Sequence, residues 1–159
     1  MADFDIQKNV NANVDGTQYI VVKVANEQYG IDIGSIDNIV RMQRITRVPK
    51  SQKYYMGVIN LRGDVVPVMN LRMKLGMEQI DYTNSTRIII TKFEGNAYIG
   101  FIVDEVMQIV NLKDEELESP SFNKNTDAEQ YITGIGKNDG LLISILDMNA
   151  LVNEGQAAQ

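Results

Sequence analysis

The sequence contains no histidine, cysteine or tryptophan. Without imidazole and thiol groups, the chain cannot provide the usual zinc ligands, a cysteine nucleophile, a Ser-His-Asp triad or a phosphoacceptor histidine. The absence of cysteine is also compatible with a reducing compartment. Only chemistry based on carboxylates or lysine stays open, and we expect neither a metal nor a cofactor.

Positive charge and long apolar runs are also scarce. Fifteen Lys and Arg against 21 Asp and Glu give a net charge of −6 and a pI near 4.6. Sequence-independent binding to nucleic acid needs clustered cations, so we expect no nucleic-acid partner. No apolar stretch approaches the roughly 18 residues that span a membrane, and residues 1–16 lack the apolar block of a signal peptide. We therefore expect a cytoplasmic protein that does not insert into membranes.

The sequence is rich in short β-branched segments that are separated by turn residues. At 159 residues and 44% hydrophobic, the chain is long enough for one compact domain or two small barrels. Short helices are predicted at Leu71–Leu75 and Met148–Val152, with Asn70 and Asp147 as N-caps. The predicted strands are Tyr19–Ala25, Gln28–Ile33, Ile39–Thr46, Gly57–Leu61, Asp64–Met69, Thr86–Phe93, Ala97–Val103, Val106–Leu112, Tyr131–Lys137 and Leu141–Leu146.

An internal repeat organises these segments. The glycine and apolar positions of residues 29–40 recur at 99–110, an offset of 70, and those of 57–71 recur at 134–148, an offset of 77. Glycine-rich β proteins can produce such echoes by chance, but two echoes in the same order favour a duplication. The repeat predicts a mostly β protein with two similar barrels related by a pseudo-twofold axis.

Some strands, such as Tyr19–Val24, are apolar on both faces. One face can fill a barrel while the other packs between the barrels, which predicts a third core and a groove at its rim.

A set of short motifs occurs in order along the chain. The most distinctive segment is GVINLRGDVVPV at Gly57–Val68. The other segments are Tyr29–Ile33, Val48–Ser51, Asn70–Arg72, Gly100–Asp104, Tyr131–Gly134 and Leu146–Asp147. Together they resemble the CheW family, which couples bacterial chemoreceptors to the histidine kinase CheA, and the similarity extends from about Gln18 to Val152.

The resemblance implies two Src-homology-3-like five-stranded β-barrels packed together, plus short helices. We expect a CheW-like domain at 18–152, with barrels at about 18–76 and 86–152 that may exchange strands, between flexible termini at 1–17 and 153–159. The implied function is that of a free-standing, non-catalytic adaptor recruited to membrane-associated receptor arrays. Alone it would be a monomer, and with CheA it would form rings or arrays.

The resemblance also implies two sets of binding residues. An apolar slot between the barrels would grip the receptor's helical tip, with polar residues at its rim. For Arg62 the alternative is an ordinary turn residue, and for Ile33, Ile36 and Val106 it is a place in the core. Asn38 and Arg87 depart from the family pattern, where Glu and an apolar residue are common. The receptor-binding set is Ile33, Ile36, Asn38, Gly57, Asn60, Arg62, Arg87, Gly100, Val106 and Ile109; the set that would face the CheA regulatory domain is Ile45 and Val65, for which a core role is equally open.

A different class of function rests on two carboxylates. Asp32 and Asp104 follow repeat-related strands and could form an acid/base pair in a hydrolase, although turn residues are expected at both places. The acidic run Lys113–Glu118 is interpreted as a solvated connector rather than a metal site.

Overall fold

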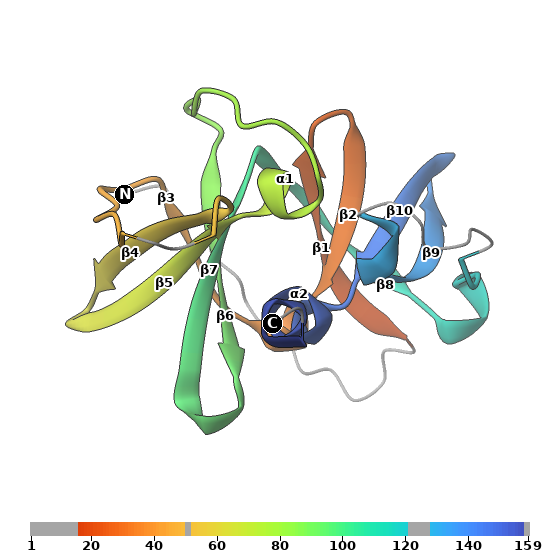
Figure 1. The fold of residues 1–159 in the computed structure, drawn as a ribbon. Coiled ribbons are helices and arrows are strands. Elements are labelled where there is room, and N and C mark those ends of the chain that lie inside the picture. Colours follow the sequence, from red (N-terminus) through yellow and green to blue (C-terminus); the bar gives the residue numbers. More distant parts are fainter. Residues whose placement is uncertain (1–15, 50–51, 121–127, 158–159) are drawn as a thin grey trace.

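The computed structural model describes residues 16–49, 52–120 and 128–157, so most of the predicted N-terminal segment and residues 50–51 of one family motif lie outside it. The described residues form ten strands in two five-stranded sheets, with two short α-helices lying between the sheets (Figure 1). The elements are β1 Thr17–Val24, β2 Glu27–Asp32, β3 Ile36–Arg41, β4 Tyr55–Leu61, β5 Asp64–Asn70, α1 Leu71–Lys74, β6 Arg87–Phe93, β7 Ala97–Val103, β8 Glu105–Leu112, β9 Ile132–Asn138, β10 Leu141–Leu146 and α2 Met148–Ala157, with 3-10 turns at Ile33–Ser35, Glu94–Asn96, Asp114–Glu116 and Glu129–Tyr131.

All ten predicted strands are present; two element ends differ from the prediction by five residues, and the others lie within three residues of it. The strand predicted to reach Thr46 ends at Arg41, because the chain leaves the sheet there and rejoins it only at Thr46. Helix α2 was expected to end at Val152 but continues to Ala157, since no proline interrupts the residues that follow. Both predicted caps are present. Asn70 Oδ1 accepts a hydrogen bond from Met73 N at 3.3 Å, and Asp147 Oδ1 accepts one from Ala150 N at 3.1 Å.

The two sheets exchange strands between the halves of the repeat. One sheet has the order β8-β1-β2-β10-β9, and the other has the order β3-β6-β7-β5-β4. The ranges 18–76 and 86–152 are therefore the halves of the repeat and not the two barrels, because each half places its first hairpin in the sheet built by the other half. The repeat relates β1 to β6, β2 to β7, β3 to β8, β4 to β9 and β5 to β10. When each strand of the first sheet is replaced by its counterpart, the order of the second sheet results.

The strand register follows the repeat as well. In the parallel pair of one sheet Gly30 is opposite Ile145, and in the parallel pair of the other Gly100 is opposite Val68. These positions are related by the same offsets of 70 and 77 residues that the sequence shows. The predicted duplication is confirmed down to individual residue pairs.

Each sheet closes on itself through one short bridge. Thr46 and Val58 exchange two backbone hydrogen bonds of 2.8 and 2.9 Å, and Glu118 and Ile135 exchange two of 2.9 and 2.8 Å. The bridges join the chain after β3 to β4 and the chain after β8 to β9. They close the two sheets into barrels and cover sheet edges that would otherwise be free to pair with other chains.

Three hydrophobic clusters form among the described residues, as the sequence predicts. Val40, Ile88 and related residues fill one barrel, Tyr19 and Val21 belong to the cluster of the other, and a larger cluster lies between the two. Alternate residues of β1 separate accordingly: Tyr19 and Val21 face their barrel, while Ile20 and Val22 face the shared core. Burying a single aliphatic side chain contributes about 1.5–3 kcal/mol, so β1 stabilises both layers at once.

Candidate functional site

The β4–β5 hairpin presents Arg62 at its tip in a left-handed backbone conformation. Arg62 has φ +55° and Gly63 has φ +85°, the combination of a two-residue turn of the kind that joins twisted strands. Asn60 Oδ1 accepts a hydrogen bond from Gly63 N at 3.1 Å and fixes the turn. Left-handed geometry costs a residue such as arginine about 1–2 kcal/mol, whereas Asn and Asp tolerate it.

The equivalent turn of the other barrel carries the residue that local preference favours. Asp139 and Gly140 have φ +52° and +79°, and Asp139 is the repeat counterpart of Arg62, 77 residues later in the sequence. Arg62 is exposed, and its side chain has no ion pair with any of the described residues. Arg62 therefore keeps a costly backbone conformation while its guanidinium is exposed to solvent.

Ile33, Ile36 and Val106 come together at the shared core. Ile36 has no exposed surface and Ile33 is 8% exposed, and both belong to the cluster between the barrels. Val106 is half-buried and packs against the same cluster, while Ile109, also on β8, is 38% exposed. The core interpretation therefore describes Ile33 and Ile36, whereas Val106 and Ile109 are the apolar residues of this group with surface open to a partner.

Asn38, Gly100 and Gly57 lie in a single row across the second barrel. The row runs Asn38–Ile90–Gly100–Val68–Gly57 through five adjacent strands. A Cβ at Gly57 would overlap the carbonyl oxygen of Thr46, and one at Gly100 would lie 2.7 Å from Ile88 Cγ2. Barrel closure and packing thus require both glycines, whatever else they do.

Arg87 is held by the backbone beside it. Its Nη1 donates to the carbonyl oxygens of Asn84 and Thr86, both at 2.8 Å, and β6 places it opposite Arg41. The side chain is half-buried, in a hollow shared with Met42. This anchoring fixes the direction of the guanidinium.

The two residues predicted to face the kinase domain have different surroundings. Ile45 is half-buried, packs against the core of the second barrel and lines an open groove. Val65, on β5, is 67% exposed, which excludes a core role for it. Its repeat counterpart Leu142 is 60% exposed, so both barrels present an apolar residue at the same place.

Asp32 and Asp104 each serve a local structural purpose. Asp32 Oδ1 accepts from Gly34 N at 2.8 Å, while Asp104 Oδ2 accepts from Ala25 N at 2.8 Å and lies 3.8 Å from Arg72 Nε. Asp32 pairs across the sheet with Tyr19, and the backbone N–H of Asp104 donates to the carbonyl of Lys23. The four-residue spacing along β1 places their backbones about 13 Å apart at roughly 3.3 Å per residue. Each carboxylate already accepts a backbone N–H, which is the local role that the turn interpretation expects.

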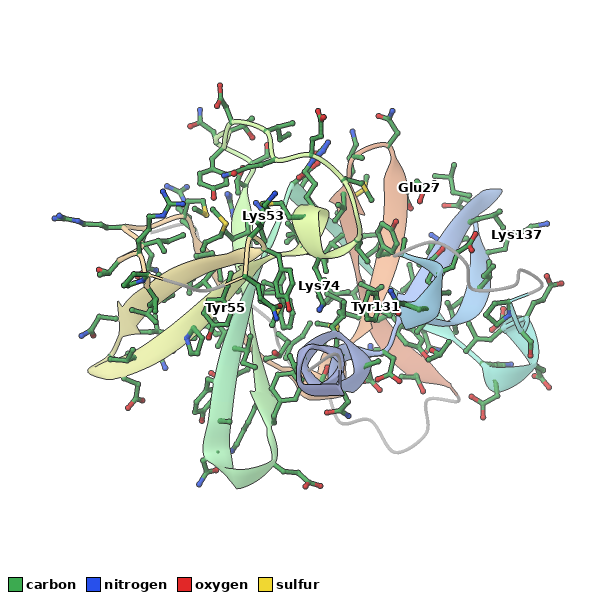
Figure 2. The ribbon with its side chains drawn as sticks, in the orientation of Figure 1. Glu27, Lys53, Tyr55, Lys74, Tyr131 and Lys137 are labelled. Carbon is green, nitrogen blue, oxygen red and sulfur yellow. The ribbon has the colours of Figure 1, made fainter. Side chains whose placement is uncertain are left out.

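Lys74 is a buried cation that sequence patterns did not reveal. It is 6% exposed, and its Nζ lies 4.1 Å from the ring centroid of Tyr54 and 5.5 Å from that of Tyr131. Figure 2 shows Lys74 and Tyr131 between the two sheets. The two tyrosines are separated by 77 residues, the repeat offset, and their carbonyls accept from the repeat-related backbone N–H groups of Asn70 and Asp147. The repeat offset between Tyr54 and Tyr131 is the feature of the sequence from which this pair of aromatic residues could have been predicted.

Three tyrosines have raised pKa values because they are buried. Burial, together with the hydrogen bond from its hydroxyl to Glu27 Oε2 at 2.9 Å, raises the pKa of Tyr29. Burial also raises the pKa of Tyr19 and of Tyr55. These hydroxyls stay protonated at neutral pH and therefore cannot act as bases.

The part of the chain that is described offers no group of three or more carboxylates placed to hold a metal ion. Nor is any of its helices both long and apolar enough to cross a bilayer.

Comparisons with known proteins identify relatives of the whole folded region. The family model described as "CheW-like domain" matches residues 18–156. The chain is 35% identical to the chemotaxis protein CheW of Bacillus subtilis over 87% of its own length and 88% of the relative's, and 29% identical to CheW of Helicobacter pylori over 95% and 94%. The crystal structure of the scaffolding protein TtCheW from Thermoanaerobacter tengcongensis superposes with a TM-score of 0.79 at 30% identity, covering 86% of this chain and 92% of that one.

Proposed function

The chain belongs to the CheW-like domain family, and from this premise we propose that it is a chemotaxis adaptor that couples chemoreceptors to the histidine kinase CheA. It performs no catalysis and takes no cofactor. The observation that carries the proposal is the family match over residues 18–156, which spans both exchanged barrels rather than a fragment of one. The chain is recruited from the cytoplasm to membrane-associated receptor arrays.

The receptor's signalling tip binds at the rim of the shared core and at the β4–β5 hairpin. Val106 and Ile109 supply apolar surface, and Ile33 and Ile36 support them from the core. Arg62 supplies forked hydrogen bonds to carboxylates or carbonyls of the receptor helices, from a rigid turn that limits the entropy lost on binding. Asn60 and the glycines Gly57 and Gly100 act by holding the backbone in place, and Asn38 and Arg87 mark where the surface differs from that of relatives.

The CheA regulatory domain binds the second barrel at Ile45 and Val65. Val65 supports this assignment because a valine that is 67% exposed on a strand contributes little to folding and is available to a partner. Weak contacts of this kind become effective when many copies are held together in an array.

The proposal is tested by retention on immobilised receptor tips and on the CheA regulatory domain, measured separately and together. We expect Arg62→Ala to weaken receptor binding at least tenfold, about 1.4 kcal/mol, while CheA binding is unchanged. Asp139→Ala is the matched control, since it truncates the residue at the same turn position in the other barrel. Wild-type protein that binds neither partner would overturn the proposal, as would an Asp139→Ala variant that loses receptor binding to the same extent as Arg62→Ala.

A further inference from the structure

Two arginines face each other on the second barrel, at the edge of the shared core. Strand pairing places Arg41 of β3 directly opposite Arg87 of β6, so both side chains lie on the same face of the sheet. The next pair on that face, Ile39 and Ile89, packs in the shared core. Like charges directly opposite each other destabilise a sheet, and none of the described residues that line the hollow around the two arginines is acidic.

Arg87 has hydrogen-bond donors that the fold does not use. Its guanidinium carries N–H groups on three nitrogens, and the bonds to the carbonyl oxygens of Asn84 and Thr86 both start from Nη1. Nε and Nη2 donate to none of the described residues. Because Nη1 is already held by two bonds, the other donors have a fixed direction, and little side-chain entropy is lost when they bind a ligand.

The loop before β6 adds hydroxyl groups to the same hollow. Thr86 Oγ1 accepts from Thr83 N at 2.9 Å, and Thr83 Oγ1 accepts from Ser85 N at 3.1 Å. A hydroxyl that accepts from a backbone N–H keeps its own proton to donate. Thr83, Thr86 and the amide of Asn84 therefore line the hollow beside the two guanidinium groups.

This chemistry suits a phosphate group better than a carboxylate. A phosphate monoester carries a charge of about −1.5 to −2 at pH 7 and offers three strong acceptor oxygens, whereas a carboxylate carries a single charge. Two arginines can neutralise a dianion through forked hydrogen bonds. The hollow has a volume of about 550 Å³, which leaves room for an organic group on the phosphate, and Met42 supplies an apolar side chain beside it.

We propose that the hollow between Arg41 and Arg87 binds the phosphate group of a small molecule. The two guanidinium groups bind the phosphate oxygens, and the hydroxyls of Thr83 and Thr86 orient them. This ligand site goes beyond the adaptor function proposed above and does not depend on it. If the adaptor function holds, a bound phosphate competes with the receptor for Arg87, which belongs to the proposed receptor-binding set.

The test is an NMR titration of the isotope-labelled full chain, in which the arginine Nε–H signals are followed. The probes are inorganic phosphate and phenyl phosphate, and acetate is the singly charged comparison, all at a constant ionic strength of about 0.1 M so that screening is equal. We expect a saturable shift of the Arg87 signal, with phosphate bound at least tenfold more tightly than acetate. Tighter binding of phenyl phosphate identifies the ligand as a phosphate monoester, and equal affinity identifies it as free phosphate; both support the site.

Arg87→Gln and Arg41→Gln should each weaken phosphate binding at least tenfold, because each removes one of the two charges; the backbone amide signal of Asn84 reports binding in these variants. Lys92→Gln removes the same charge from an exposed position at the other end of β6, and this control should bind phosphate like the wild type. Thermal melting of every variant shows that the fold is retained.

Three results overturn the inference: no saturable shift with either phosphate probe, phosphate bound no more tightly than acetate, or phosphate binding that persists in R41Q/R87Q. Any of them with receptor and CheA binding intact leaves the adaptor function standing. Phosphate binding by a chain that binds neither receptor nor CheA would overturn the adaptor function alone.

Discussion

At the scale of single residues, Arg62 is expected to lower the stability of its turn while it provides the proposed contact with the receptor. Asparagine and aspartate accept a left-handed backbone at a smaller cost than arginine, and the equivalent position 139 is an aspartate. We expect Arg62→Asn to raise the free energy of unfolding by about 0.5–1 kcal/mol in urea titrations followed by circular dichroism. The same variant should lose receptor binding. A drop in stability would mean that the arginine side chain supports the fold.

Tyr29 gives the protein an alkaline limit of stability. Burial and the hydrogen bond to Glu27 raise the pKa of Tyr29 above its ordinary value of 10.0, so above pH 10 the unfolded chain loses this proton more readily than the folded one. The stabilisation is complete below pH 10 and decreases as the pH rises further, by up to about 1.4 kcal/mol per pH unit. We expect Tyr29→Phe to make the free energy of unfolding fall less steeply between pH 10 and 11.5. An equally steep fall in the variant would assign the effect to other groups.

The caps at Asn70 and Asp147 could be predicted from the sequence. A side-chain oxygen just before a helix accepts a hydrogen bond from a backbone N–H of the first turn, which has no partner within the helix. Nothing in the sequence indicated that Arg62 shares the left-handed geometry of the β4–β5 turn with Gly63. Arginine has no intrinsic preference for that conformation, so composition gives no signal. Lys74 was missed for a related reason, since a lysine in a short polar-looking helix is ordinarily solvated.

At the scale of strands, the glycines on β7 and β9 differ in what surrounds them. A Cβ at Gly100 would lie 2.7 Å from Ile88 Cγ2 and 3.2 Å from Ile90 Cδ1 inside the barrel, whereas one at Gly134 would lie 3.6 Å from the nearest atom. We expect Gly100→Ala to destabilise the fold by about 1–3 kcal/mol through overpacking, and Gly134→Ala to have little effect. Urea titration of both variants checks this, and equal stability would show that the barrel relaxes around the added methyl group.

The strands themselves were predictable because each is short, β-branched and bounded by turn residues. Their partners were only partly predictable. The repeat indicated that β1 and β2 correspond to β6 and β7, but both an unexchanged and an exchanged pairing satisfy the same hydrophobic pattern. The strand predicted to end at Thr46 was also too long. Met42 and Ile45 are apolar, as strand residues often are, but they line a groove and do not belong to the sheet.

At the scale of the whole molecule, strand exchange makes the two halves of the repeat dependent on each other. Residues 18–76 alone would keep β1 and β2 but lose β8 and β10, which are their partners in the first sheet. Tyr19, Val21 and the shared core would then face water. A molecule built this way is expected to unfold in one cooperative step, because neither barrel is complete without strands from both halves.

This dependence predicts the behaviour of a chain divided in the loop between α1 and β6. Fragments 1–76 and 77–159 should each lack stable structure by circular dichroism and give poorly dispersed amide NMR spectra. Mixed in equal amounts they should recover the spectrum of the intact chain, because each supplies the hairpin that completes the other's barrel. Full-length protein should show coincident urea transitions by tyrosine fluorescence and by circular dichroism. A fragment that folds alone, or two separated transitions in the intact chain, would show that a barrel is stable without the exchanged hairpin, and the shared core would then join two independent units instead of creating one.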